Sequence, residues 1–187
     1  RGVTLFCARD DIFAALDERI VVQTIPSLFE PTGQEAPAMA ALPAPDTVHC
    51  APLGWPSITQ AFAAIAQWFA EAQPALFITD VSAELGQLAR LCSVPHVAVL
   101  QHGERSDPGH MAAYDSAVGL LAPYSERLEQ HDRPAAMRRK THYASGVGID
   151  CSGFPDRAEA RAKLGIGLQE DLVLVLAGGG GEGTPSA

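Results

Sequence analysis

The chain has 187 residues, of which 47% are hydrophobic and 19% are charged, which is enough to build one domain with a sizeable core. Its formal net charge of −9 argues against a nucleic-acid-binding surface as the main function. No apolar run reaches the roughly 20 residues that a membrane-spanning helix needs. The four cysteines have neither metal-ligand nor redox spacing, which favours a reducing, cytoplasmic setting.

Strands and helices are predicted to alternate along the chain. Short apolar runs predict strands at 3–8, 20–25, 75–80, 96–101, 118–123, 142–147 and 171–177. Helical spacing and N-capping signals predict helices at 57–72, 82–92, 107–117 and 156–165, with a further helix beginning at 125. The region 26–56 holds seven of the 14 prolines and predicts a long loop.

This alternation predicts an α/β, Rossmann-like fold with a mainly parallel sheet and helices on both faces. In such folds ligands bind beyond the carboxyl ends of the strands. The last predicted strand runs into a glycine turn, GGGGEG, that a helix would have to follow to bind phosphate. We therefore expect a domain in residues 1–147 that lacks its beginning, a linker at 148–170, and the first strand of a second domain in 171–187.

The segment FITDVSAELGQLARLCSVPHVAVLQHGERSDPGHMAAYDSAVGLLAPYSERLE, residues 77–129, resembles the N-terminal domain of bacterial GT-B glycosyltransferases. It is most similar to family 28-like proteins, which are related to the peptidoglycan N-acetylglucosaminyltransferase. The matching elements are TDVSAE after a strand, SVP before the next strand, and QHGERSDPGH. The terminal VLAGGGGEG is similar to the glycine-rich turn of the family's donor-binding domain, so the resemblance covers roughly residues 75–187.

The resemblance implies transfer of a sugar from a nucleotide-sugar, most simply a UDP-sugar, to an acceptor hydroxyl. The acceptor can be lipid-linked, and neither a metal nor a cofactor is implied. This chain would be mostly the acceptor-side domain of a hexosyltransferase and inactive by itself, with only weak binding of nucleotide-sugars. A nonenzymatic Rossmann-like or flavodoxin-like ligand-binding domain is the alternative interpretation.

Two residues are candidate catalytic groups. Asp80 ends a predicted strand and could accept a hydrogen bond or a proton from a sugar hydroxyl; it could equally be the N-cap of the helix at 82–92. His102 follows another strand, and with Glu104 nearby it could act as a general base oriented by a carboxylate.

The stretch QHGERSDPGH supplies the candidate substrate-binding residues, Gln101, Gly103, Glu104 and His110. Asp107 is most simply the N-cap of the helix that follows. His110 would then lie in the first turn of that helix, beside the same crevice. Since each of these residues follows a strand closely, we expect Asp80, Gln101, His102 and His110 to converge at the carboxyl edge of the sheet.

Two further stretches suggest binding surfaces. Backbone N–H groups of Gly178, Gly179, Gly180 and Gly181, with Glu182, could approach a diphosphate, although a flexible tail is the alternative interpretation. The basic residues Arg133, Arg138, Arg139 and Lys140 could attract anionic lipid at the inner membrane face, or form a solvated helix and turn.

Overall fold

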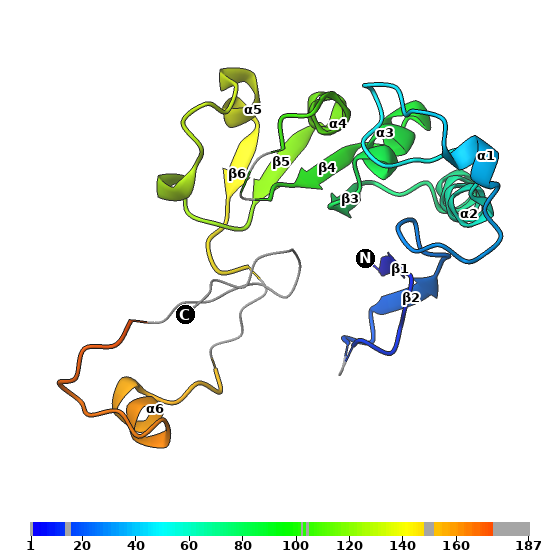
Figure 1. Ribbon diagram of the computed structural model, residues 1–187. Helices are drawn as coiled ribbons and strands as arrows, with labels where there is room; N and C mark the ends of the chain where they lie inside the picture. The colour runs from blue at the N-terminus through cyan, green and yellow to red at the C-terminus, as the bar shows by residue number, and fades with distance from the viewer. Residues whose placement is uncertain (1, 14–15, 102, 104, 148–151, 174–187) are drawn as a thin grey trace. The chain divides into compact units, whose positions relative to one another are not determined.

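The computed structural model describes residues 2–13, 16–101, 103, 105–147 and 152–173 (Figure 1). The chain divides into two compact units, Arg1–Val147 and Gly148–Ala187. In the first unit, two strands form a parallel pair, β1 (Val3–Cys7) and β2 (Ile20–Thr24). A second sheet holds four parallel strands in the order β3 (Phe77–Asp80), β4 (His96–Val99), β5 (Gly119–Ala122) and β6 (Thr141–Tyr143).

The connecting segments carry the helices. They are α1 (Pro37–Ala40), α2 (Pro56–Ala72), α3 (Ala83–Leu91), α4 (Pro108–Ser116), the 3-10 turn η1 (Glu126–Leu128) and α5 (Ala135–Arg139). The second unit contains α6 (Arg157–Lys163) within the segment that was predicted to be a linker.

The predicted α/β fold with parallel strands is confirmed. Several details differ from the prediction. The strands form two separate sheets, the predicted loop contains α1, α5 was not predicted, and the helix expected from residue 125 is the short η1. Residues 171–173 are not in a strand, and the rest of the predicted strand at 171–177 lies outside the described residues.

Consecutive strands of the larger sheet are also neighbours in space, so each crossover runs in the same direction. Right-handed crossovers then place their helices on one face, and Figure 1 shows α3, α4 and α5 on the same side of the larger sheet, whereas helices on both faces were predicted. Burial alternates accordingly. Phe77, Thr79, His96, Ala98 and Leu120 are buried under the helices, whereas the residues between them are half-buried or exposed.

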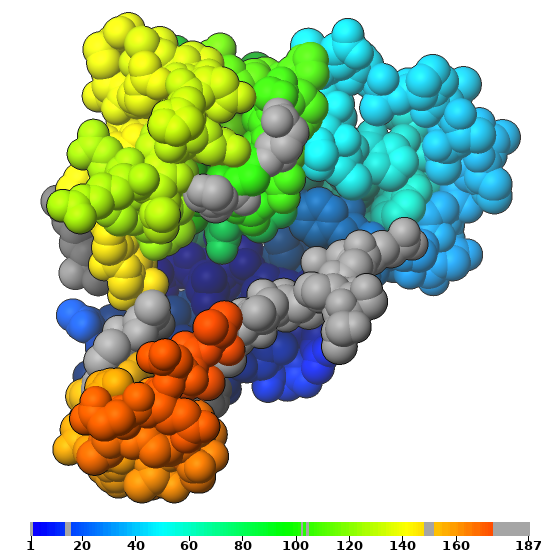
Figure 2. Space-filling view, turned by 60° about the vertical axis from the view of Figure 1, so that its left-hand side comes forward, coloured from blue at the N-terminus to red at the C-terminus, as the bar shows by residue number. Residues whose placement is uncertain are grey.

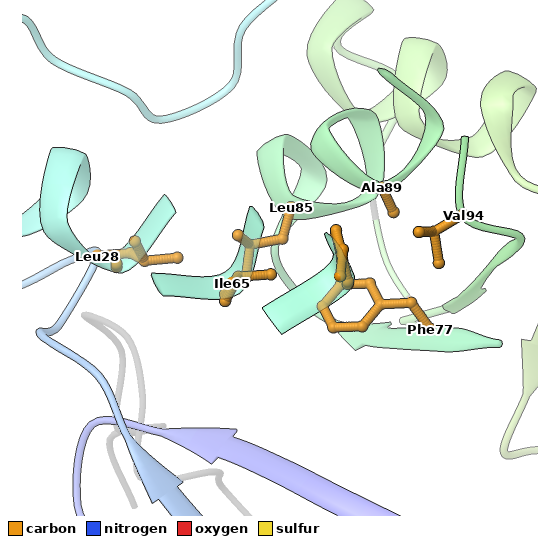
Figure 3. Packing of buried hydrophobic residues seen from close by; sticks show 8 residues of the cluster. Leu28, Ile65, Phe77, Leu85, Ala89 and Val94 are labelled. Carbon is orange, nitrogen blue, oxygen red and sulfur yellow. The ribbon is translucent and has the colours of Figure 1, made fainter. Parts of the chain in front are cut away.

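The larger core lies between α2, α3 and β3. Ala61, Ile65 and Phe69 recur at helical spacing on α2 and are buried. The Phe69 ring meets Phe77 edge to face, with 4.9 Å between ring centroids. The other buried members are Leu28, Leu85, Ala89 and Val94 (Figure 3). Edge-to-face contact of Phe6 with Trp68, at 5.2 Å between centroids, joins β1 to α2.

A second core holds the other half of the sheet, where Leu100, Tyr114, Leu120 and Met137 pack together with small residues. Lys140 closes this region because its Nζ donates to the carbonyl oxygens of Tyr114, Asp115 and Ala117, at 2.7, 3.2 and 2.9 Å. These are carbonyls at the C-terminal end of α4, where a cation is favourable.

The second unit begins its helix with the predicted capping signal. The Asp156 side chain accepts a hydrogen bond from the Glu159 backbone N–H at 2.8 Å. Glu159 then forms an ion pair with Lys163 one turn later, at 2.9 Å. Gly165, with φ of +69°, ends the helix in the left-handed conformation that glycine adopts without strain.

Candidate functional site

A small, mainly apolar cleft lies at the carboxyl ends of β3 and β4, beside the first turn of α4. Its lining combines strand ends with the two helix starts: Thr79, Val81, Ser82, Ala83, Ala98, Val99, Gln101, His110, Ala113 and Tyr114. Burial raises the pKa of the Tyr114 hydroxyl. The residues that line the cleft carry hydroxyl, amide and imidazole groups, and the cleft lies at the edge where parallel α/β sheets bind ligands.

The turn from β3 into α3 is strained at Val81, which has a φ of +75°. This conformation is rare for a β-branched residue and costs on the order of 1–3 kcal/mol, and residues of this kind cluster at functional sites. The Ser82 hydroxyl accepts a hydrogen bond from the Leu85 backbone N–H at 3.4 Å and is the N-cap of α3. The N-cap interpretation of Asp80 is therefore wrong, because Ser82 occupies that position.

The structure brings Gln101 and His110 together in the cleft, but it places Asp80 beside a different cavity. Asp80 is the last residue of β3 and pairs in register with Val99 of β4, so it lies at the same sheet edge. It lines a wider, mainly apolar cavity between β1 and β3. His102 and Glu104 lie outside the described residues, and so do Gly178, Gly179, Gly180, Gly181 and Glu182.

Gln101 is held by the loop that follows it. Its Oε1 accepts hydrogen bonds from Nε and Nη2 of Arg105, at 3.2 and 3.0 Å. Gly103, between them, has a φ of +112°, a conformation that side-chain-bearing residues rarely adopt. The glycine of the QHG stretch thus turns the chain so that Arg105 can fix the Gln101 amide.

His110 is oriented by a carboxylate. Asp107 is the N-cap of α4, as predicted, and accepts from the His110 backbone N–H at 3.2 Å. Its second oxygen lies 2.6 Å from Nδ1 of the same histidine, whose side chain is only 4% exposed. Desolvation raises the pKa of Asp107, but the hydrogen bonds from the His110 side chain and backbone outweigh it, so the pKa is lowered. Against an ionised carboxylate, Nδ1 carries the proton and Nε2 of neutral His110 can accept one.

A second histidine, which the sequence did not single out, completes the group. His49 lies in the long loop before α2, and its Nδ1 is 3.2 Å from Oδ1 of Asp107. The imidazole rings of His49 and His110 are stacked obliquely, with 4.0 Å between their centroids. We call His49, Asp107 and His110 the His–Asp–His cluster. No local signal could have found His49, because 58 positions separate it from Asp107.

The loop that carries His49 is tied down by α3. Glu84, a buried residue in the first turn of α3, accepts hydrogen bonds from the backbone N–H groups of His49 and Cys50, at 2.7 and 2.6 Å. Nε2 of Gln87, one turn later, donates to the Thr47 carbonyl at 3.0 Å. In Figures 1 and 2 the cyan segment that precedes α2 accordingly lies against the green helices.

Gly109 permits this close approach. A Cβ at this position would lie 2.4 Å from the His49 backbone nitrogen, so a side chain would push the loop away. The Gly109 carbonyl also accepts from Gln87 at 3.4 Å. The loop that carries His49, helix α3 and helix α4 therefore meet at Gly109, and the His–Asp–His cluster lies directly beside this contact.

A third histidine, His96, is buried in a different environment. His96 in β4 is 1% exposed, and its Nε2 lies 2.7 Å from the Thr79 hydroxyl. Burial, helped by the positive charge of Lys140, lowers the pKa of His96 to about 4. His96 is therefore neutral near pH 7. Gly86 of α3 packs on its ring, so that a Cβ there would lie 2.5 Å from Cε1.

The basic segment is partly engaged in contacts within the domain. Arg133 is buried and forms an ion pair with Glu129 at 2.6 Å, and Arg138 donates to the Arg133 carbonyl at 2.6 Å. Lys140 binds the end of α4 as described above. Membrane contact through Arg133, Arg138, Arg139 and Lys140 stays a prediction. Within the described part of the chain, no helix has the length and apolar character to cross a membrane.

Comparison of the chain with protein-family models, curated protein sequences and solved structures found no match. The function is therefore inferred from the residues and their geometry.

Proposed function

We propose that this chain is mostly the acceptor-side domain of a GT-B glycosyltransferase, and that the cleft at the carboxyl ends of β3 and β4 binds the acceptor hydroxyl. The observation that carries the proposal is the pairing of buried His110 with the ionised carboxylate of Asp107 at this edge of a parallel sheet. The family resemblance of residues 77–129 adds the class of reaction.

His110 can supply general base catalysis in this setting. An acceptor hydroxyl would donate to Nε2, while Asp107 holds the ring through Nδ1 and stabilises the imidazolium. As the proton moves to Nε2, the hydroxyl oxygen would form a bond to the anomeric carbon of a UDP-sugar. The bond between that carbon and the diphosphate breaks, and UDP leaves with the electron pair. Gln101 and Tyr114 would hold the sugar by hydrogen bonds.

A carboxylate-oriented imidazole suits this task because histidine is the side chain that most often takes a proton from a reacting group in general base catalysis. The predicted catalytic roles of Asp80 and His102 stay predictions. Among the described candidates, His110 has the support of both a carboxylate partner and a position in the cleft.

The test is nuclear magnetic resonance of the 187-residue chain, titrated separately with a soluble β-glycoside of N-acetylglucosamine and with UDP-N-acetylglucosamine. The glycoside is expected to shift the signals of Gln101, His110 and Tyr114. His110→Gln should weaken glycoside binding about tenfold, the worth of one hydrogen bond to a well-placed partner. His142→Gln, at an exposed site in β6, is the matched control.

Two results would contradict the proposal. One is glycoside binding that leaves the cleft signals unchanged. The other is UDP-N-acetylglucosamine binding in this cleft more tightly than about 10 μM, a level of roughly 7 kcal/mol, because the donor would then occupy the site assigned to the acceptor. Binding of neither sugar would favour the nonenzymatic ligand-binding alternative.

A further inference from the structure

The His–Asp–His cluster has the composition of a metal site as well as that of a hydrogen-bonded base. Each member offers one ligand atom, and the three atoms all lie within 4.8 Å of one another. The two carboxylate oxygens face different rings: Oδ2 of Asp107 lies 2.6 Å from Nδ1 of His110, and Oδ1 lies 3.2 Å from Nδ1 of His49. Two imidazoles and one carboxylate are a ligand set that Zn²⁺ and related transition-metal ions use in proteins.

The distances suit such an ion. Zn²⁺ bonds to nitrogen and oxygen are about 2.0–2.2 Å long, and in a tetrahedral site this places neighbouring ligand atoms about 3.3 Å apart. The distances of 2.6 Å from Oδ2 and 3.2 Å from Oδ1 of Asp107 to the two imidazole nitrogens are each within an ångström of that spacing. Small rotations of two side chains would therefore convert the hydrogen-bonded cluster into a coordination site, with the backbone left in place.

The fold holds the three ligands in position before any ion arrives. Asp107 and His110 are fixed on the first turn of α4 by the N-cap. His49, the distant ligand, is fixed by the two hydrogen bonds that its loop makes to Glu84, and Gly109 leaves room for that loop. Outer contacts that orient metal ligands in this way are a regular feature of metal sites.

Access and charge are also suitable. The His110 side chain is buried, but those of His49 and Asp107 are 44% and 40% exposed, so an ion can enter from the His49 side and keep a water ligand there. The ionised Asp107 supplies one negative charge, and the histidines bind as neutral imidazoles. Coordination through Nδ1 moves the ring proton to Nε2, so each neutral imidazole binds without net loss of a proton.

We propose that His49, Asp107 and His110 form a binding site for a divalent transition-metal ion of the Zn²⁺ class. The site goes beyond the proposed transferase function, because no sugar is needed to fill it. The ion would also change how the cleft meets a ligand. With the metal on Nδ1, Nε2 of His110 carries a hydrogen and donates to an acceptor hydroxyl, so the metal-bound form cannot use His110 as a base.

The experiment is a titration of the chain, purified without a polyhistidine tag and freed of metal by chelation, with Co²⁺ as a spectroscopic probe. One equivalent of Co²⁺ is expected to give the visible ligand-field absorption of a low-coordinate site, and Zn²⁺ should abolish it by displacement. Zn²⁺ should also raise the melting temperature, because it binds the folded chain.

Two variants test the ligands without unfolding the domain. His49→Gln changes a partly exposed loop residue, and Asp107→Asn retains a side chain that caps helices well. Each should weaken Co²⁺ binding at least tenfold. His131→Gln, at an exposed site outside the cluster, should bind like the original chain.

The proposal is overturned if Co²⁺ up to about 1 mM produces no ligand-field absorption and Zn²⁺ leaves the melting temperature unchanged. It is also overturned if His49→Gln binds Co²⁺ as tightly as the original chain. Because no sugar is present, these outcomes are independent of the glycoside titration.

Discussion

His96 in β4 and His110 in α4 are both almost fully buried, and they differ in what surrounds them. His96 lies beneath α3, meets the Thr79 hydroxyl, and has a pKa of about 4. Its Nδ1 is buried without a hydrogen-bond partner among the described residues. His110 meets an ionised carboxylate and borders a cleft. Burial alone therefore does not distinguish the two histidines. They differ in the hydrogen-bond partner of the ring and in whether the residue lines a cleft.

The largest expected effect tests the closed environment of His96. In Gly86→Ala the new methyl group would lie 2.5 Å from Cε1 of His96, a ring fixed by Thr79. We expect a loss of about 3 kcal/mol in the free energy of unfolding, even though alanine favours the helix by about 1 kcal/mol. Denaturant unfolding measures it. In the Gly86→Ala/His96→Ala pair the void should accept the methyl group, so additive losses would contradict this explanation.

Acid titration tests the neutral state of His96. The folded pKa of about 4 is below the ordinary value of 6.5, so the unfolded chain binds this proton more readily. The contribution to stability is complete above pH 6.5, falls as the pH drops below it, and is fully lost near pH 4. From pH 7 to pH 5 we expect a loss of about 2 kcal/mol. Comparing unfolding curves of the original chain and His96→Leu isolates this contribution, and equal pH slopes would refute it.

The loop that brings His49 beside His110 is held by Glu84. In Glu84→Gln the acceptor for the His49 and Cys50 N–H groups keeps its shape and loses its charge. We expect a cost of about 1.5 kcal/mol and faster hydrogen exchange at these two amides. Glu18→Gln, at an exposed position, serves as control. Unchanged exchange at His49 would mean that Glu84 does not hold the loop.

The smallest expected effect concerns Lys140, which contacts the C-terminal end of α4 and whose charge acts on His96. In Lys140→Met the end of α4 loses the cation that binds three carbonyl groups, at a cost of about 1 kcal/mol. The same change removes a positive charge that lowers the pKa of His96, so that pKa should rise. Nuclear magnetic resonance titration of the imidazole signals measures it. A shift of the His96 pKa in the opposite direction would show that the Lys140 charge is not what acts on it.

Much of the fold could be predicted from the sequence, because the signals are local. Apolar spacing identifies α2, and the capping residues Asp107 and Asp156 begin α4 and α6. These patterns act within a few residues, and neighbouring backbone hydrogen bonds satisfy them. The sequence also predicted that Gln101 and His110 would lie near each other, since residues that follow strands of a parallel sheet meet at one edge, and both line the cleft.

The tertiary structure alone decided the rest. Local signals name Asp80 as readily as Ser82 for the N-cap of α3, and only the three-dimensional turn selects Ser82. Glu84 resembles a residue that favours a helix start, yet it binds a loop 35 positions away. His49 reaches Asp107 across 58 positions. Contacts between residues so far apart in the sequence depend on how the long loop packs against α3 and α4. The spacing of residues along the chain does not predict that packing.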